Sequence, residues 1–402
     1  MAKQEERRLP EGWQWVKLGD VCEVVMGQSP PGTSYNSNGL GEPLLNGPTE
    51  FGLVHPNPVQ WTTEPTRFAE QNDILFCVRG ATTGRKNIAD RRYCIGRGLA
   101  AIRGKNNSTD TNFLYILLDH VTHKLLEETA GSTFPNLPGA KLNNFLIPLP
   151  PIAEQKRLVA ILNDRFAAIE TARKATESQL EAAKALPAAY LREVFNSPEA
   201  EGWRSVKLGD VCEVRGGKRL PIGSRLVDYK TPFPYIRVTD FQRSSVNLEN
   251  LKFIEEDIHR QIKQYIIHKD DVYISIAGSI GIIGTIPTTL DGANLTENAA
   301  KLVLQDLNII DKKYLVNFLQ SPIGQNQIQK RTNVVGQPKL ALTRIKTIEI
   351  PLPPIAKQKE IVTTLNDRFS TIETIRKAIE DQLEAINALP ATLLRQAFNG
   401  EL

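Results

Sequence analysis

Two stretches of the chain show a regular hydrophobic pattern that predicts long helices. After prolines 150–151 and again after 353–354, apolar residues follow a 3-4 alternation, which is typical of a helix with one narrow apolar seam. The seam residues are Val159, Leu162, Phe166, Ile169, Thr176, Leu180 and Ala183 in the first stretch and Val362, Leu365, Phe369, Ile372, Ile379, Leu383 and Ile386 in the second. Because a narrow seam needs a partner, we expect the two helices to pair antiparallel.

The expected helices have similar lengths. Pro187 and Pro390 are expected to end or kink each helix near its carboxyl end. Each straight section is then about 35 residues, or roughly 50 Å. Arg173 and Arg376 fall at equivalent seam positions, where they either set the pairing register or extend to solvent. An ordinary bundle core is the alternative, but two equally long helices separated by a whole domain favour rigid struts.

The chain is an internal repeat. GWQWVKLGDVCEV begins at Gly12 and GWRSVKLGDVCEV begins at Gly202. Likewise, IPLPPIAEQKRLVAILNDRF begins at Ile147 and IPLPPIAKQKEIVTTLNDRF begins at Ile350, with roughly two-thirds of positions identical as the match continues. The intervening segments, 25–146 and 215–349, share only scattered features. This favours a duplicated framework that holds two diversified domains over an old duplication followed by neutral drift.

Both variable segments have the pattern of mixed α/β domains. Strands are expected at 74–78, 98–102, 234–238, 271–276 and 301–304, and helices at 111–128 and 312–327. The expected fold is two mixed α/β domains separated by an antiparallel pair of long coiled-coil helices, with pseudo-twofold symmetry. The boundaries predicted are 10–150 for the first domain, 151–200 for the central helix, 201–353 for the second domain and 354–402 for the last helix.

Composition restricts the class of protein only modestly. The chain has 402 residues, of which 41% are hydrophobic, and a net charge of +4. It has no apolar run of 18 residues that would predict a membrane span and no apolar segment near residue 1 that would predict a signal peptide. The four cysteines form no CxxC pair, so we expect reduced thiols and a cytoplasmic protein.

Positive charge gathers in the first variable domain. Between Asp73 and Lys105 the chain has eight basic residues against two acidic ones. Such a strand-turn-strand region suits DNA phosphates and base edges, and arginine can bind guanine through two hydrogen bonds. The predicted DNA-binding residues are Arg79, Thr82, Arg85, Lys86 and Arg97. For any one arginine, a solvated or salt-bridged side chain is the alternative.

The second variable domain is less basic and offers more polar side chains. Its predicted DNA-binding residues are Lys218, Arg219, Arg237, Thr239, Ser279, Asn298, Gln337 and Lys339. Because the two domains differ in chemistry, we expect two different half-sites and an asymmetric target. The glycines of RGATTGRK and AGSIGIIG are interpreted as tight turns after a strand, since neither segment contains a phosphate-binding GxxxxGK[ST] motif.

Catalytic motifs are missing from the sequence. It has no [DNS]PP[YFW] methyltransferase motif, no glycine-rich cofactor loop, no HExxH and no GxSxG. His120 and His123 can share a helix face, but no third ligand suggests a metal site. A binding protein is therefore favoured. An enzyme with an unfamiliar site and a coiled-coil scaffold without a DNA role remain the alternatives.

Several segments together resemble the specificity subunits of type I restriction-modification enzymes. They are the two GWxxVKLGDVCEV blocks, the two IPLPPIAxQKxxV blocks, DILFCVRGATTGRKNIADRRYCIGRGLAAIR, DVYISIAGSIGIIGTIP, LDGANLTENAAKLV and the final LLRQAFNGEL. The resemblance covers residues 10–402. It implies a non-catalytic subunit in which each variable domain is a target recognition domain and the two helices form a conserved spacer.

The resemblance also implies partners. Two methylation subunits would hold the spacer and two motor-nuclease restriction subunits would complete the complex. S-adenosylmethionine, ATP and magnesium would then be bound by those partners, and no cofactor by this chain. The residues predicted to contact a partner lie at the helix starts: Gln155, Arg157, Gln358 and Lys359. Glu360 stands at the position equivalent to Arg157, so the two partner surfaces differ in charge.

Overall fold

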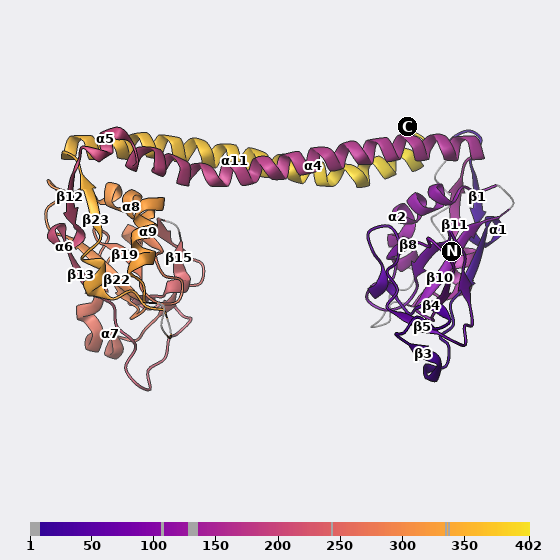
Figure 1. Ribbon diagram of the computed structural model, residues 1–402, viewed down its shortest axis with the longest axis horizontal. Helices are drawn as coiled ribbons and strands as arrows, with labels where there is room; N and C mark the ends of the chain where they lie inside the picture. The colour runs from indigo at the N-terminus through magenta and orange to yellow at the C-terminus, as the bar shows by residue number, and fades with distance from the viewer. Residues whose placement is uncertain (1–8, 106–107, 128–135, 243, 334–335, 337) are drawn as a thin grey trace. The chain divides into compact units, whose positions relative to one another are not determined.

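A computed structural model describes residues 9–105, 108–127, 136–242, 244–333, 336 and 338–402. Packing divides the chain into two compact units. Unit 1 comprises the described residues up to Thr176 together with Gln382–Leu402, and unit 2 comprises Glu177–Asp381. Each unit therefore contains one α/β domain and a segment of each long helix, α4 (Ile152–Phe195) and α11 (Ile355–Phe398) (Figure 1).

Among its described residues, the domain of unit 1 contains three β-sheets, one of them a two-stranded ribbon, and three α-helices. The helices are α1 (Leu18–Val21), α2 (Thr111–Glu127) and α3 (Gly139–Asn144). The strands are β1 (Gln14–Lys17), β2 (Cys22–Met26), β3 (Tyr35–Asn36), β4 (Glu42–Leu45), β5 (Gln60–Thr62), β6 (Phe68–Ala69), β7 (Ile74–Cys77), β8 (Lys86–Ile88), β9 (Tyr93–Ile95), β10 (Leu99–Gly104) and β11 (Leu146–Leu149).

A central antiparallel sheet in the order β2-β10-β7-β8 organises unit 1. Both faces of this sheet are buried. Because alternate residues of a strand point to opposite sides, each strand contributes to both packing layers. Ile74 and Phe76 of β7 pack toward α2 and the long helices, whereas Leu75 and Cys77 pack toward the second sheet, β3-β5-β4-β9-β6. Figure 1 shows α2 between the helix pair and the central sheet. A two-stranded β1-β11 ribbon leads into α4.

The domain of unit 2 repeats this arrangement. Its helices are α5 (Pro198–Glu201), α6 (Leu208–Val211), α7 (Glu256–Ile262), α8 (Lys312–Gln320), α9 (Pro322–Arg331) and α10 (Leu342–Ile345). Its strands are β12 (Arg204–Lys207), β13 (Cys212–Gly216), β14 (Pro234–Ile236), β15 (Phe241–Gln242), β16 (Ser245–Val246), β17 (Lys252–Phe253), β18 (Ile266–Ile267), β19 (Val272–Ser275), β20 (Ile283–Thr285), β21 (Ala293–Leu295), β22 (Ala299–Leu304) and β23 (Glu349–Leu352).

The sheets of unit 2 correspond to those of unit 1. The central sheet has the order β13-β22-β19-β20, and the second sheet has the order β17-β14-β21-β18. The parallel pair β14–β21 matches the parallel pair β4–β9 of unit 1. The β12-β23 ribbon leads into α11 as β1-β11 leads into α4. The predicted pair of mixed α/β domains is confirmed.

The long helices pair antiparallel. In unit 1 the start of α4, with Leu158 and Leu162, shares a core with Leu393 and Phe398 near the end of α11. In unit 2 the end of α4 shares a core with the start of α11, and this core contains the buried residues Leu191, Phe195, Ile361, Val362 and Leu365. The predicted seam residues are buried or half-buried throughout.

The sequence predicted that Pro187 and Pro390 end or kink each helix, and neither proline ends its helix. Both α4 and α11 run 44 residues and contain Pro187 and Pro390 in their interior. A proline removes one backbone hydrogen bond from a helix. Here the following turns stay helical because they are anchored in the domain cores, through Phe195 in unit 2 and Phe398 in unit 1.

The helix predicted over 312–327 is two helices, which corrects that prediction. The α8 helix ends at Gln320, and α9 begins at Pro322. Ser321 lies in extended backbone conformation between them and accepts a hydrogen bond from the amide of Gly324 through its hydroxyl. Serine followed by proline is a typical helix start, so this break was readable from the sequence. The other predicted helix matches α2, although Glu128 lies outside the described residues.

Candidate nucleic-acid interface

In unit 1, three loops and one extended segment converge at the carboxyl end of β7. The amide of Val78 donates to the carbonyl oxygen of Gly98 at 2.9 Å, and the amide of Leu137 donates to that of Val78 at 2.8 Å. The loop after β2 joins them, because the amides of Gly27 and Gln28 donate to Leu99 and Ile95 oxygens at 2.9 Å each. We call this convergence the loop junction of unit 1; it comprises 27–29, 78–85, 96–98 and 136–137.

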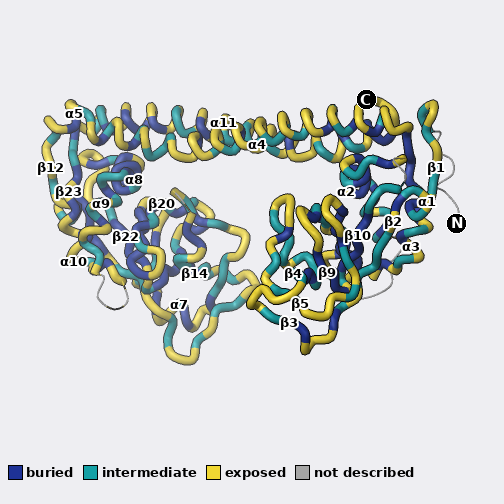
Figure 2. The backbone as a smooth tube through the Cα atoms, turned by 45° about the vertical axis from the view of Figure 1, so that its right-hand side comes forward, coloured by how far each residue is buried: buried dark blue, intermediate teal, exposed yellow. Residues whose placement is uncertain are grey.

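Unit 2 has an equivalent loop junction, which comprises 217–219, 276–279, 296–298 and 339–340. The amide of Ile276 donates to Asn298 at 2.8 Å, and the amide of Leu340 donates to Ile276 at 2.9 Å. The amide of Lys218 donates to Leu295 at 2.8 Å. The two junctions therefore have the same pattern of backbone hydrogen bonds but different side chains. Figure 2 shows that loops of both domains are largely exposed on the side away from the long helices.

Most predicted residues of unit 1 lie at this junction with exposed side chains. Arg79 and Arg97 flank the hydrogen bond between Val78 and Gly98, so the structure brings them together. Arg79 also donates weakly to Asn136 at 3.4 Å. Thr82 and Arg85 lie in the turn between β7 and β8, where Gly80 and Gly84 have φ of 87° and 96°. These positive φ angles confirm the predicted glycine turn.

Lys86 is a correction to the predicted DNA-binding set. Its side chain is 7% exposed and its Nζ atom lies 2.7 Å from the carboxylate of Asp119 on α2. The same Nζ lies 3.4 Å from the centre of the Tyr115 ring. Burial lowers the pKa of Lys86, and the Asp119 charge opposes that shift. Lys86 therefore joins β8 to α2 and does not face solvent.

Part of the basic cluster is neutralised within the domain. Arg103 donates to the buried carboxylate of Asp73 at 2.7 Å, and Arg92 lies 3.6 Å from Glu70. Burial raises the pKa of Asp73 to about 6, although the hydrogen bond from the Glu70 amide and the Arg103 charge oppose the shift. These contacts follow the salt-bridge alternative. Fewer basic side chains of unit 1 are therefore available to DNA than the eight basic residues counted in the sequence.

In unit 2, six predicted residues have exposed side chains. They are Lys218, Arg219, Thr239, Ser279, Asn298 and Lys339. All except Thr239 belong to the loop junction. The backbone of Lys339 forms isolated antiparallel β-bridges with Ala277 and Asn333. The prediction for Gln337 falls outside the described residues.

Arg237 is a second correction. Its Nε and Nη2 atoms donate to the two carboxylate oxygens of Asp240 at 3.0 and 2.6 Å, and Nη2 also donates to the carbonyl oxygen of Asn250 at 2.9 Å. Asp240 is 4% exposed. Arg237 thus compensates a buried charge and stabilises the turn over 238–240 instead of facing a ligand.

The sequence analysis missed two residues of the junctions, Ser29 in unit 1 and Glu297 in unit 2. Ser29 accepts a hydrogen bond from the amide of Arg97 at 3.2 Å in unit 1. At the equivalent place in unit 2, the Nε of Arg219 donates to Glu297 at 2.7 Å. The available signal was a glycine that follows the repeated GDVCEV block in both copies, Gly27 and Gly217. A Cβ at either glycine would lie within 2.2 Å of a carbonyl oxygen. Only glycine therefore lets this loop pass so close to the neighbouring turn.

The partner-binding prediction for two glutamines is also corrected. Gln155 and Gln358 are fully buried, and each accepts a hydrogen bond at 2.8 Å from the amide that precedes α2 or α8, at Asp110 and Asp311. Their amide groups donate to backbone oxygens of residues 108, 150, 309 and 353. They fasten each long helix to its domain. Arg157 and Lys359 are exposed, and Arg157 donates to Glu154 and to the Leu402 carbonyl oxygen.

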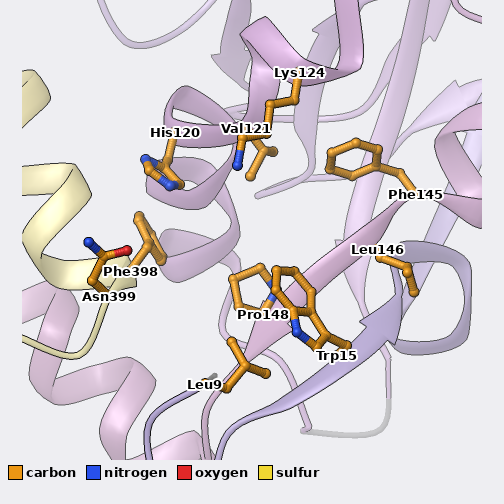
Figure 3. A pocket seen from close by; sticks show the side chains of 10 residues that line it. All are labelled: Leu9, Trp15, His120, Val121, Lys124, Phe145, Leu146, Pro148, Phe398 and Asn399. Atoms are coloured by element: carbon orange, nitrogen blue, oxygen red, sulfur yellow. The ribbon is translucent and has the colours of Figure 1, made fainter. Parts of the chain in front are cut away.

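A cavity of about 360 Å³ lies in unit 1 where the end of α11 meets the domain. Figure 3 shows His120 beside Phe398, with ring centres 4.9 Å apart, and Trp15 beside Pro148. Its lining is mostly apolar, with His120, Lys124 and Asn399 as the polar members. Such a lining suits DNA less than the exposed basic loops do.

In the described part of the chain, the side chains that could bind metal are dispersed and the cysteines are buried. Within it, His, Cys, Asp and Glu side chains do not form groups of three or more that could hold a metal ion. The four cysteines are free and buried, and burial raises the pKa of Cys22 and of Cys212 to about 12. Among the described residues, no helix is long and apolar enough to cross a membrane.

A family model matches the chain twice. The model describes the type I restriction modification DNA specificity domain, and it matches residues 10–182 and 200–385. The matches coincide with the two copies of the internal repeat.

Individual proteins give the same result. A Methanocaldococcus jannaschii protein provisionally described as the MjaX type I specificity subunit is 40% identical over 184 residues, which cover 45% of this chain and 43% of that protein. The specificity subunit of the Escherichia coli EcoBI enzyme is 23% identical over 98% of this chain and 87% of its own length.

Solved structures share the fold. One from a study of complex assembly and conformational transition of the type I R-M system has a TM-score of 0.77 at 21% identity, covering 98% of this chain and all of that one. The HsdS subunit from Thermoanaerobacter tengcongensis has a TM-score of 0.66 at 21% identity, covering 99% of this chain and all of that one.

Proposed function

Because the chain belongs to the family of type I restriction-modification DNA specificity proteins, we propose that it recognises a two-part asymmetric DNA site and brings methylation and restriction subunits to it. Members of this family that match over most of the chain are named specificity subunits, which are the non-catalytic DNA-recognition components of these enzymes. The self-contained enzyme and the scaffold without a DNA role are therefore set aside.

The single observation that carries the proposal is the pair of loop junctions. The two junctions have the same backbone hydrogen bonds, so each domain presents loops from an equivalent frame. Their side chains differ: unit 1 presents Arg79 and Arg97, whereas unit 2 presents Lys218, Arg219 and Asn298. A shared frame with different donors and acceptors suits two different half-sites, since base edges are distinguished by their hydrogen-bonding groups.

Two continuous helices support a fixed gap between the half-sites. Each helix runs 44 residues and is anchored in a domain core at either end. At 1.5 Å per residue, such a helix spans roughly 65 Å, which exceeds the roughly 34 Å of one turn of B-DNA. The helix length would then limit the spacing of the two half-sites.

Partner subunits supply the chemistry in this proposal. Two methylation subunits would bind the long helices and transfer methyl groups from S-adenosylmethionine, and restriction subunits would use ATP and magnesium. The exposed Arg157 and Lys359 are the remaining candidates for partner contacts. This chain would bind none of those cofactors, and it would act on DNA in the cytoplasm.

The test is to co-express the chain with its methylation subunit and map N6-methyladenine across the host genome by single-molecule sequencing. The proposal predicts methylation at one asymmetric motif, with two specified parts and a gap of constant length. A stable complex that methylates no such motif contradicts it. DNA cleavage or methylation by the purified chain alone contradicts the non-catalytic role.

A further inference from the structure

An arginine and a glutamate from separate loops meet at the junction of unit 2. The Nε of Arg219 donates to Oε1 of Glu297 at 2.7 Å, although the two residues lie 78 positions apart. The Arg219 side chain is 79% exposed, whereas that of Glu297 is 29% exposed. The charged end of the arginine is therefore tethered on one edge and faces solvent on the other.

Glu297 is held in place by its own domain. Its Oε2 accepts a hydrogen bond from the Thr296 hydroxyl at 3.0 Å, and the Tyr235 hydroxyl lies 3.4 Å away. Thr296 and Tyr235 are buried. Burial alone would raise the pKa of Glu297, but the hydrogen bonds from Arg219, the backbone and Thr296 outweigh it and lower that pKa. The carboxylate is thus a fixed anion at neutral pH.

The loop that carries Arg219 is also fixed. The Tyr235 hydroxyl donates to the carbonyl oxygen of Lys218 at 2.7 Å, and the Lys218 amide donates to Leu295. Gly217 crosses so close to Thr296 that a Cβ there would lie 2.0 Å from its carbonyl oxygen. Both ends of the ion pair therefore rest on rigid backbone. An ordinary surface ion pair lacks such support and contributes little.

The matching positions of unit 1 also carry an arginine, but on the opposite loop. Ser29 occupies the place of Arg219, and Arg97 occupies the place of Glu297. In unit 1 the backbone amide of Arg97 makes the contact with Ser29, whereas in unit 2 the guanidinium of Arg219 itself is held by Glu297. A guanidinium held through Nε keeps its Nη groups in a fixed plane, and this fork matches the O6 and N7 acceptors of guanine.

We propose that Arg219 binds a guanine in the half-site of unit 2 and that Glu297 is its positioning residue. The inference rests on the proposed DNA recognition and assigns one specificity contact within it. Glu297 repels DNA phosphates, so it lowers general affinity while it increases discrimination. Loss of discrimination without loss of general affinity would therefore distinguish a positioning role of Glu297 from a structural or purely electrostatic one.

The experiment selects binding sites with the full-length chain, co-purified with its methylation subunit, from double-stranded DNA with a randomised centre. With Glu297→Ala, which removes the acceptor of the Arg219 Nε–H, we expect the preference for one G·C pair to fall about 5- to 100-fold, the usual range for one two-pronged arginine contact. Binding to unrelated DNA should stay equal or strengthen, because one negative charge is lost. Arg219→Ala and Arg219→Lys should lose preference at the same base pair.

Glu213→Ala is the matched control. Glu213 lies on β13 of the same unit and its carboxylate pairs with Arg215 at 2.6 Å, so the variant removes an equally paired charge away from the junction. It should leave the selected motif unchanged. The inference is overturned if Glu297→Ala selects the wild-type motif, or if the Glu297 and Arg219 variants change different base pairs. A wild-type complex that selects no motif overturns the proposed function itself.

Discussion

The exposure of single side chains separates the residues that can reach DNA from those that hold the domains together. In the sequence, Lys86 and Arg79 looked alike, because both are basic and follow the same strand. The acid and the ring that bury Lys86 lie on α2, about thirty positions later, so their contact depends on the tertiary fold. Glu297 was missed for the same reason. Arg237 was different, since its partner Asp240 lies only three positions away in the sequence.

Truncation of Arg79 should affect methylation, whereas truncation of Arg237 should affect stability. Arg79→Ala removes an exposed side chain, so we expect weaker sequence-specific methylation with an unchanged melting temperature. Arg237→Ala leaves the buried Asp240 without its partner, which should cost about 2 kcal/mol. The melting temperature should then fall by roughly 5 °C. Thermal unfolding and methylation mapping of both complexes check this, with the exposed Arg225→Ala as control.

Equal melting temperatures for Arg237→Ala and Arg225→Ala would show that the Asp240 pairing is not structural. Normal methylation by Arg79→Ala would remove Arg79 from the candidate DNA contacts of unit 1.

At the scale of elements, periodicity predicted most of the architecture. Both long helices, the seam and the buried strands of the central sheets were predicted because each has a clear period or an apolar run bounded by turns. The errors occurred where local signals compete with packing. Pro187 and Pro390 are helix breakers locally, yet buried residues beyond them keep each helix intact. The short strands β3, β6, β15 and β16 are two residues long and show no period.

The buried glutamines should determine how firmly each long helix is joined to its domain. Gln155→Ala removes three hydrogen bonds from a fully buried site and should lower the free energy of unfolding by about 2–3 kcal/mol. Gln358→Ala should cost a similar amount in unit 2. Denaturant titration measures both.

The matched control is Gln179→Ala, an exposed glutamine on the same helix as Gln155, which should change the free energy of unfolding by at most about 0.5 kcal/mol. If Gln155→Ala is no more destabilising than this control, the glutamine does not fasten the helix to the domain.

At the scale of the whole molecule, duplication explains how one chain can recognise two sequences. The repeated segments form the ribbons, the first strand of each central sheet and the long helices, whereas the diversified segments supply the loops of the junctions. This division was visible in the sequence, because identity is high in the framework and low between its blocks. Which side chains point outward was not visible, since that depends on contacts between distant segments.

Replacement of the second domain by a copy of the first tests the central claim most directly. The variant carries residues 10–150 in place of 201–353, keeps both long helices, and is co-expressed with the methylation subunit for N6-methyladenine mapping. If each domain recognises its own half-site, the methylated motif should lose one half and contain the other half twice. An unchanged asymmetric motif from a stably assembled variant would contradict the assignment of one half-site to each domain.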